Sequence, residues 1–510
     1  MAEIAPKPVK LPPFQAWLAS NIPAVYDNTM SYYDELTSLI KWLETEVVPN
    51  VNSAIVLVNQ LRNFVENYFD NLDVQEEINN KLDQMAEDGT LQEIIAEYIQ
   101  ANVAWTFDTV ADMKLATNLV NGSYAKTLGF RSVDDGGGAL YYITSSGTAN
   151  EMDVIAIGAL FANLVDDREY TAKQFGAYGD GTHDDTTYLQ EAIDFVSSKK
   201  GKLTLTNGTY MVDAITSLFL KSNLEINFVN AKIKAITNNQ TTYNVLSIIN
   251  TENCVINDAV IEGDKDTHTG DTGEFGYGVN IRGASSNIIF NNLTVSNCWG
   301  DGIFIRRERF DSTDYYPDGI WFNGYTRISD CRRQGVSIIS GENLYFDKLI
   351  CRNISGVDPS AGVDVEPGTT ADKIGNIYIN YLETDGTLKG FTLRLRCQMT
   401  GDVIIGEINH HHQNTIPYGA EGRYEHAFRC MFEYFDADQA KYKVCVDRIY
   451  SDHNGIQLEN LYNDVTPQVI VGDVIIDEYS FIYGASPAVA HRSLCNIRYT
   501  ETTNLSNSLG

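Results

Sequence analysis

The stretch GVDVE at residues 362–366 is one copy of a pattern that recurs through the second half of the chain and decides the fold. Each copy begins with a glycine or an alanine, after which apolar and polar residues mostly alternate. The seven copies are GVNIR from Gly278, GIFIR from Gly302, GVSII from Gly335, GVDVE from Gly362, GFTLR from Gly390, AFRCM from Ala427 and GIQLE from Gly455. By subtraction they start 24, 33, 27, 28, 37 and 28 residues apart. Short strands repeated at such intervals predict a β-solenoid with one repeat per rung, because a propeller blade needs about 40 residues or more.

The aligned copies also predict which side chains stack on one another, because equivalent positions of parallel rungs lie about 4.8 Å apart. Two residues after the glycine or alanine, the copies read Asn280, Phe304, Ser337, Asp364, Thr392, Arg429 and Gln457. Three residues after it they read Ile281, Ile305, Ile338, Val365, Leu393, Cys430 and Leu458, and four residues after it Arg282, Arg306, Ile339, Glu366, Arg394, Met431 and Glu459. The middle ladder is entirely apolar, as a solenoid core requires. We therefore expect the other two ladders to line one exposed strip.

Two acids on that strip, Asp364 and Glu366, are the candidate catalytic pair, and Asp301 in a neighbouring copy is a third candidate acid. Residues i and i+2 of a strand have Cα atoms about 6.6–6.8 Å apart. This spacing can bring two carboxyl groups near the separations of glycosidase acid pairs, about 5–5.5 Å or 6.5–9.5 Å. Binding of an anionic sugar without cleavage, or an ordinary solvated charge cluster, are the alternatives that these residues leave open.

The candidate substrate-binding residues share the same region of the repeat. Arg394 and Arg306 could hold an anionic substituent, since guanidinium groups pair well with carboxylates and phosphates. Trp299 and Phe304 offer flat apolar faces for sugar rings, and Ser337 belongs to the same ladder as Asp364.

A helix is predicted just before the first rung, in FGAYGDGTHDDTTYLQEAIDFVSSKKG. Leu189, Ile193 and Val196 have helical spacing, Asp185 or Thr186 can cap the start, and Gly201 can end it. Such a helix would cover the open edge of the solenoid. The acids and histidine of this stretch, Asp180, His183, Asp184 and Asp185, are therefore interpreted as turn and cap residues. The run His410–His412 alternates between strand faces and does not suit one metal ion, and we predict no metal and no cofactor.

The first hundred residues have a helical pattern with a heptad seam. The seam residues are Val47, Val51, Ala54, Val58, Leu61, Val65, Tyr68 and Leu72. Valines at both kinds of seam position favour an oligomer of three or more chains, although one helix packed in its own bundle has a similar pattern. We expect a helical attachment and trimerisation region at 1–104, a small β-rich connector at 105–170, the β-solenoid at 171–500 and a tail at 501–510.

Composition excludes several classes of function. The net charge of −31 argues against a nucleic-acid partner, which requires clustered cations. The N-terminus lacks an apolar signal core, and the apolar stretch 154–165 is too short to cross a bilayer, so no membrane insertion is expected. The eight cysteines form no CxxC pair, and we interpret most of them as small buried hydrophobic residues and not as disulfides.

Three segments resemble known proteins. FGAYGDGTHDDT, followed by a helix and Asn/Gly-rich strand repeats, resembles the right-handed parallel β-helix of the pectate-lyase superfamily. FDTVADMKLATNLVNGSYAKTLGFRSVDDGGGALYYI is similar to a connector that precedes such β-helices in phage tail proteins, and LDVQEEINNKLDQMAEDGTL to segments of structural proteins of phages that infect Gram-positive hosts. Together they imply a mainly β fold, a right-handed parallel β-helix with an N-terminal α-helical coiled-coil stalk.

The resemblance also implies a function and partners. It points to a homotrimeric tail spike or neck appendage, made in the host cytoplasm and located in the virion, which docks on tail or neck proteins through its N-terminal region. Its expected role is to bind, and to degrade, a host surface glycan such as capsular polysaccharide or teichoic acid. In β-helix enzymes of this kind acids on a stacked strand face do the chemistry, which favours Asp364 and Glu366. The alternatives are an adhesin that only binds the glycan and a free polysaccharide hydrolase or lyase; the coiled coil and the missing signal peptide count against the latter.

Overall fold

The computed structural model describes residues 104–411, 426–433, 441–453, 456–459, 468–478, 482–484 and 496–499, together with residues 56, 59–60, 81 and 83–86. The seam residues between Val47 and Leu72, His412 and the tail at 501–510 lie outside the described residues. The chain divides into two compact units, Met1–Val165 and Asp166–Gly510.

The first unit contains a small mixed sheet whose described strands run in the order β1-β2-β3-β5-β4. These strands are β1 (Ala104–Phe107), β2 (Tyr124–Thr127), β3 (Leu140–Thr144), β4 (Val154–Ile157) and β5 (Leu160–Leu164), and the short helix α6 spans Val110–Lys114. Tyr141 and Ile143 alternate with exposed residues and form part of its core. The loop after β2 is shaped by Asp135, whose carboxylate accepts backbone N–H groups from Phe130, Arg131, Ser132 and Gly137.

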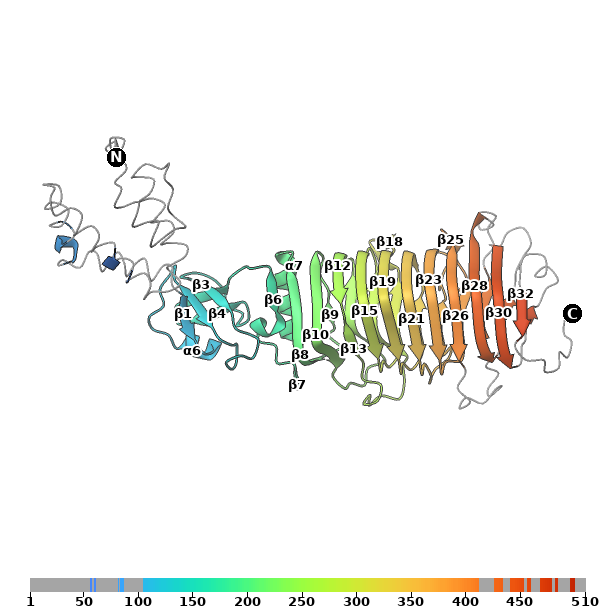
Figure 1. Cartoon of the computed structure of the whole chain (residues 1–510), viewed down its shortest axis with the longest axis horizontal. Helices are drawn as coiled ribbons and strands as arrows, with labels where there is room; N and C mark the ends of the chain where they lie inside the picture. Colours follow the sequence, from blue (N-terminus) through green and yellow to red (C-terminus); the bar gives the residue numbers. More distant parts are fainter. Residues whose placement is uncertain are drawn as a thin grey trace, which may run out of the picture. The chain divides into compact units, whose positions relative to one another are not determined.

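The second unit is a parallel β-helix in which the chain alternates between two sheets (Figure 1). Among the described residues one sheet has 15 strands and the other has 10. The first contains β6 (Glu169–Thr171), β7 (Asp180–Asp184), β8 (Lys202–Val212), β10 (Leu224–Ala235), β12 (Glu252–Asn257), β13 (Val260–Glu262), β15 (Ser286–Ser296), β19 (Asp318–Ser329), β21 (Gly341–Arg352), β23 (Lys373–Asp385), β25 (Gln398–Met399), β26 (Val403–His411), β28 (Lys443–His453), β30 (Gln468–Glu478) and β32 (Asn496–Tyr499).

The second sheet carries the repeated motif, so we call it the motif sheet. It contains β9 (Leu218–Phe219), β11 (Thr242–Ile249), β14 (Phe275–Arg282), β16 (Asp301–Arg306), β20 (Gln334–Ile338), β22 (Ala361–Val365), β24 (Lys389–Leu395), β27 (His426–Phe432), β29 (Ile456–Glu459) and β31 (Ile482–Gly484). All its strand pairs are parallel, for example β20 with β22 and β22 with β24. The predicted β-solenoid is thus confirmed.

The core is built from stacked apolar side chains. Ile281, Ile305, Ile338, Val365 and Leu393, which the motif places in one ladder, are all fully buried. The predicted apolar ladder is therefore confirmed for these rungs.

Asparagine ladders join the rungs where the chain turns. Asn287 donates from its side-chain amide to Asn253 at 2.8 Å, and Asn253 donates to Asn223 at 3.3 Å. All three have positive φ, a conformation that asparagine tolerates better than most residues. This explains why asparagine recurs at equivalent positions of successive rungs.

The glycine that opens the motif is required by packing. A Cβ on Gly335 would lie 2.5 Å from the carbonyl oxygen of Gly362 and 2.6 Å from the sulfur of Cys351. A Cβ on Gly302 would lie 2.4 Å from a methyl carbon of Ile328. The strand therefore passes so close to the opposite sheet and the next rung that the corner has no room for a side chain. Cys351 fills the remaining space, and the seven described cysteines are all buried, as predicted.

Replacing Gly335 with Ala should therefore destabilise the β-helix by about 1–3 kcal/mol, because the new methyl group overpacks this corner. The free energy of unfolding can be compared with that of Gly368→Ala, whose Cβ would have its nearest neighbour 3.9 Å away. Equal stability of the two variants would contradict this explanation of the motif.

The predicted helix is α7 (Thr186–Ser198), which buries Leu189, Ile193 and Val196 against the first rungs. Its turn residues differ from the prediction in detail. Asp185 occupies the cap position, but its carboxylate accepts the N–H groups of Tyr178 and Gly179 at 2.6 and 2.9 Å. The N–H of Thr186 is instead bound by Asp184 at 2.9 Å. The helix ends at Ser198, before Gly201.

Candidate active site

The register of the motif sheet brings the predicted site residues onto stacked rungs. Phe304 pairs with Ser337, Ser337 with Asp364, and Asp364 with Thr392. With Asn280 before them and Arg429 after them, these residues form what we call the outer ladder. The predicted ladder two residues after the glycine is confirmed for these rungs.

A second ladder, which the sequence alignment did not identify, consists of the residues immediately before the glycine or alanine. Asp301 pairs with Gln334, Gln334 with Ala361, Ala361 with Lys389, and Lys389 with His426. We call this the pre-glycine ladder. Gln334 donates from Nε2 to Oδ2 of Asp364 at 2.5 Å, and Thr392 lies 3.1 Å from Nε2 of His426. The two ladders therefore share one face of the sheet.

The expectation of an exposed strip is wrong for the outer ladder, whereas in the ladder four residues after the glycine Arg306 is exposed and Glu366 and Arg394 are partly exposed. Asp301 is 0% exposed, Asp364 2% and Ser337 1%. Because two ladders share the face, each fills the gaps between the side chains of the other, and β20 and β22 are buried on both sides. Asp364 and the neighbouring Asp301 are therefore enclosed polar groups.

Burial changes the acidity of both aspartates. It raises the pKa of Asp301 to about 7, an effect that Arg333 opposes and that the charges of Asp364 and Glu274 reinforce. It likewise raises the pKa of Asp364 to about 7, and there the nearby charge of Glu366 adds to it while Lys389, Arg333 and Arg429 oppose it. Burial therefore favours the protonated form of both carboxyl groups.

The two aspartates differ in their immediate partners. Oδ2 of Asp301 lies 3.0 Å from Nη1 of Arg333, which favours the ionised form. Asp364 has the amide of Gln334 as its hydrogen-bond partner and a second carboxylate, Glu366, two residues away.

Several polar atoms on this face lack a protein partner. They are Oδ1 of Asp301, Oε1 of Gln334, Oγ of Ser337 and Oδ1 of Asn280. An unpaired buried polar atom typically costs about 1–3 kcal/mol, and a group of them on one face is typical of sites built for function and not for stability.

Glu366 lies outside this enclosed face. Its carboxylate is 3.1 Å from Arg394 and 3.6 Å from Arg396, and both arginines also bind Glu433, at 2.7 and 2.6 Å. All four side chains are about one-third exposed. We call this group the charged edge. Arg394 thus lies beside the acid, as the alignment suggested, and Glu366 is ion-paired with two arginines.

The two aromatic candidates are not available to a sugar ring, contrary to expectation. Phe304 is 7% exposed because it stacks on Tyr277 with ring centroids 4.2 Å apart. Trp299 lies between His268, with centroids 4.1 Å apart, and the guanidinium of Arg332, 3.9 Å from the ring centroid. Arg306, by contrast, is exposed.

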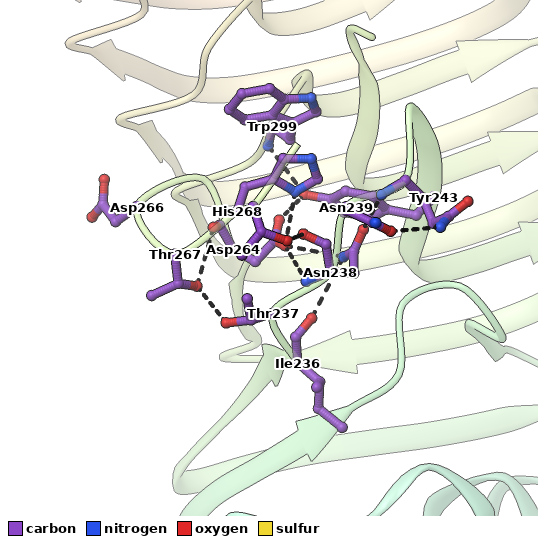
Figure 2. Close-up of polar contacts among 12 residues, drawn as sticks. Ile236, Thr237, Asn238, Asn239, Tyr243, Asp264, Asp266, Thr267, His268 and Trp299 are labelled. Atoms are coloured by element: carbon purple, nitrogen blue, oxygen red, sulfur yellow. Dashed lines mark hydrogen bonds and ion pairs between the residues drawn. The ribbon is translucent and has the colours of Figure 1, made fainter. Parts of the chain in front are cut away.

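Figure 2 shows the buried cluster that holds Trp299 and the loop after β13. At its centre Asp264 accepts hydrogen bonds from the hydroxyl of Tyr243 and from the backbone and side chain of Asn238. Nδ1 of His268 lies 3.0 Å from the same carboxylate. Each partner comes from a different strand or loop, so the cluster fixes the corner beside Trp299.

The remaining candidates are dispersed. Asp180 binds its own turn, with the N–H groups of Thr182 and His183 at 2.9 and 3.0 Å. His410 is buried against Thr384, whereas His411 is exposed. Within the described part of the chain no three metal-ligating side chains come together, and no helix there is long and apolar enough to cross a membrane.

No protein-family model and no curated protein matches this chain. Solved structures with similarity include the tailspike protein gp49 of Acinetobacter baumannii bacteriophage Fri1, a capsular polysaccharide depolymerase. It is 14% identical, with a TM-score of 0.49 over 79% of this chain and 76% of that one. The tailspike of A. baumannii phage AM24 is 15% identical, with a TM-score of 0.40 over 76% and 66%. WceF of Pantoea stewartii, a glycan biofilm modifying enzyme with a tailspike-like parallel β-helix, is 10% identical, with a TM-score of 0.39 over 79% and 53%.

Proposed function

We propose that this protein is the tail spike or a related appendage of a bacteriophage, and that its β-helix binds and cleaves a host surface polysaccharide. The observation that carries the catalytic part is the pair Asp301 and Asp364, two carboxyl groups enclosed on one face of the motif sheet with unlike partners, Arg333 and Gln334. Glycoside hydrolysis needs one protonated and one ionised carboxyl group at the same pH.

The environments of the two aspartates support different roles for them. Arg333 favours the anion of Asp301, so Asp301 is the base or nucleophile. The charge of Glu366 favours the protonated form of Asp364, so Asp364 is the general acid that protonates the departing sugar oxygen. The charge of Asp364 also raises the pKa of Asp301, so the ionisation of Asp301 depends on that of Asp364. Glu366, the partner of Asp364 in the sequence-based prediction, becomes part of the binding surface.

The exposed charges next to this face suit a polymer with anionic groups. Arg306 and Arg394 hold equivalent positions of the motif, with Ile339 and Glu366 on the two rungs between them. Arg396 lies beside Arg394, and both pair with Glu366 and Glu433. A solenoid presents such positions over many rungs, which matches a repeating polysaccharide such as capsule or teichoic acid. Binding should therefore weaken as salt is added.

An adhesin that binds the glycan without cleaving it is the second candidate, and one observation favours it. Asp301 and Asp364 are 0% and 2% exposed, so a sugar reaches them only by displacing a neighbouring side chain.

The assay that separates the two candidates uses the full-length protein and purified capsular polysaccharides and wall teichoic acids. Release of oligosaccharides with new reducing ends and no unsaturated sugar establishes a hydrolase, and release with an unsaturated sugar at the new non-reducing end establishes a lyase. Binding without release of fragments establishes the adhesin. If the protein neither binds nor cleaves any of these glycans, the proposal is overturned.

The proposal includes a homotrimer held by the heptad seam at residues 47–72 and docked on the virion through the N-terminal region. Replacing both Val58 and Leu61 with Asp should dissociate the trimer, because each Asp buries an unpaired charge in the seam. Light scattering of the full chain measures this directly. A parent protein that is monomeric at micromolar concentration would contradict the assembly.

A further inference from the structure

One corner of the β-helix carries a hairpin that the repeat does not require. Between β16 and β19 the chain forms the antiparallel strands β17 (Glu308–Phe310) and β18 (Thr313–Tyr315), whereas the next corner, between β20 and β21, is short. Asp311 and Ser312 connect the strands, and both have positive φ, as in the tight turns that match strand twist. We call residues 308–315 the aromatic hairpin.

The base of the aromatic hairpin is bound to the rungs on both sides. Arg307 donates from Nε to Asp372 at 2.6 Å and from Nη2 to Thr369 at 3.1 Å, and its Nη1 pairs with Asp314. Glu308 pairs with Arg282 on the preceding rung. The hairpin is therefore held in one orientation, which lowers the entropy cost of binding a ligand to it.

Its outer part presents two aromatic rings to solvent. Phe310 is 42% exposed and Tyr315 is 39% exposed, with ring centroids 6.1 Å apart and planes inclined at 53°. By contrast, Trp321, Tyr345 and Tyr378 on the other sheet stack with planes within 2–3° of parallel. In that stack each ring covers the face of the next, whereas Phe310 and Tyr315 are inclined to each other and each is about two-fifths exposed.

We propose that Phe310 and Tyr315 form a subsite that holds a sugar ring of the glycan chain. This inference rests on the proposed function. The hairpin base binds the loop 366–372, which begins at Glu366 of the charged edge, so the rings, Arg306 and the charged edge belong to the same side of the motif sheet. Aromatic faces bind the apolar C–H face of a sugar, while the arginines bind its anionic groups. The subsite thus selects glycan chains in which one sugar ring has an accessible C–H face and a sugar unit further along the chain carries a negative charge.

The experiment compares full-length parent protein with Phe310→Ala, Tyr315→Ala and the double variant on an array of purified capsular polysaccharides and wall teichoic acids. The matched control is Tyr142→Ala, which removes an equally exposed ring (40%) from the first unit. Each single variant should weaken binding to the recognised glycan by about two- to tenfold, and the double variant by more. Tyr142→Ala should bind as the parent does.

The possible outcomes separate this inference from the function on which it rests. Glycan binding by the parent that is unchanged in the double variant would overturn the subsite and leave the proposed function standing. A parent that binds no glycan on the array would overturn both. If the double variant loses binding and also dissociates in light scattering, the rings are a contact with a second copy of the chain, and the subsite is overturned. Weaker binding with an unchanged oligomeric state supports it.

Discussion

Replacing Asp364 with Asn should lower the rate of glycan cleavage by about 10²–10⁴-fold, the usual contribution of a general acid. The amide keeps the shape of the side chain and the space it fills, but it supplies no proton to the departing oxygen. Glycan binding should change little, because the arginines of the charged edge and Arg306 remain in place. The measurement is the rate of reducing-end release at saturating polysaccharide, with circular dichroism to verify the fold.

Two further variants decide which residue is the partner of Asp364. Asp301→Asn should cause a loss of the same size, because it removes the ionised member of the pair. Glu366→Gln should affect binding more than chemistry and lower the rate by less than about tenfold, since Glu366 is paired with Arg394 and Arg396 at 3.1 and 3.6 Å. If instead Glu366→Gln is as inactive as Asp364→Asn, and Asp301→Asn cleaves at the parental rate, the pair is Asp364 and Glu366.

The register of the motif sheet could be predicted from sequence because each copy of the motif begins with a glycine or an alanine on which the copies can be aligned. Seven copies aligned on a small residue give the stacking order Phe304, Ser337, Asp364 and Thr392, and the structure pairs these residues in that order. The glycine does this reliably because a Cβ there would collide with the next rung. A register shift would require that small residue elsewhere.

The burial of the acids could not be predicted in the same way, because strict alternation fails at the glycine. A period of two places Gln334 and Val336 on one face and Gly335 and Ser337 on the other. In the structure a Cβ on Gly335 would point into the core, toward Cys351, and the side chain of the next residue, Val336, is also buried. Gln334, the residue before the glycine, instead contacts Asp364 on the outer face. The pre-glycine ladder therefore joins the outer ladder and encloses it. The sequence did contain a signal for this ladder, namely its polar members Asp301, Gln334 and Lys389. Polar residues at equivalent positions of several repeats indicate that the position does not face the apolar core.

The enclosure of Asp364 leads to a second large effect, on stability. An aspartate whose pKa is about 7 when folded and near 3.8 when unfolded binds more protons in the folded state. The free energy of unfolding therefore falls as pH rises from about 4 to 7, by about 4 kcal/mol for one such group. Asp364→Asn removes this cost, so the variant should be more stable than the parent at pH 8 and equal to it near pH 4. The gain in stability would accompany the loss of cleavage, the usual trade-off at a strained active site.

The effect of Asp364 is isolated by the difference in stability between Asp364→Asn and the parent protein at each pH. The pH profile of the parent alone does not isolate it, because other carboxylates have lowered pKa values and stabilise the protein as pH rises. Burial raises the pKa of Glu433, but hydrogen bonds and charges from Arg396 and Arg394 outweigh it and lower the value overall. Glu433→Gln should therefore destabilise the protein at pH 8, with a small effect because the pair is partly exposed. Thermal unfolding midpoints at pH 5 and pH 8, at one scan rate, measure both differences. If Asp364→Asn is no more stable than the parent at pH 8, the carboxylate of Asp364 is better solvated than its enclosure implies, and the proton that the proposed mechanism assigns to it would be absent at neutral pH.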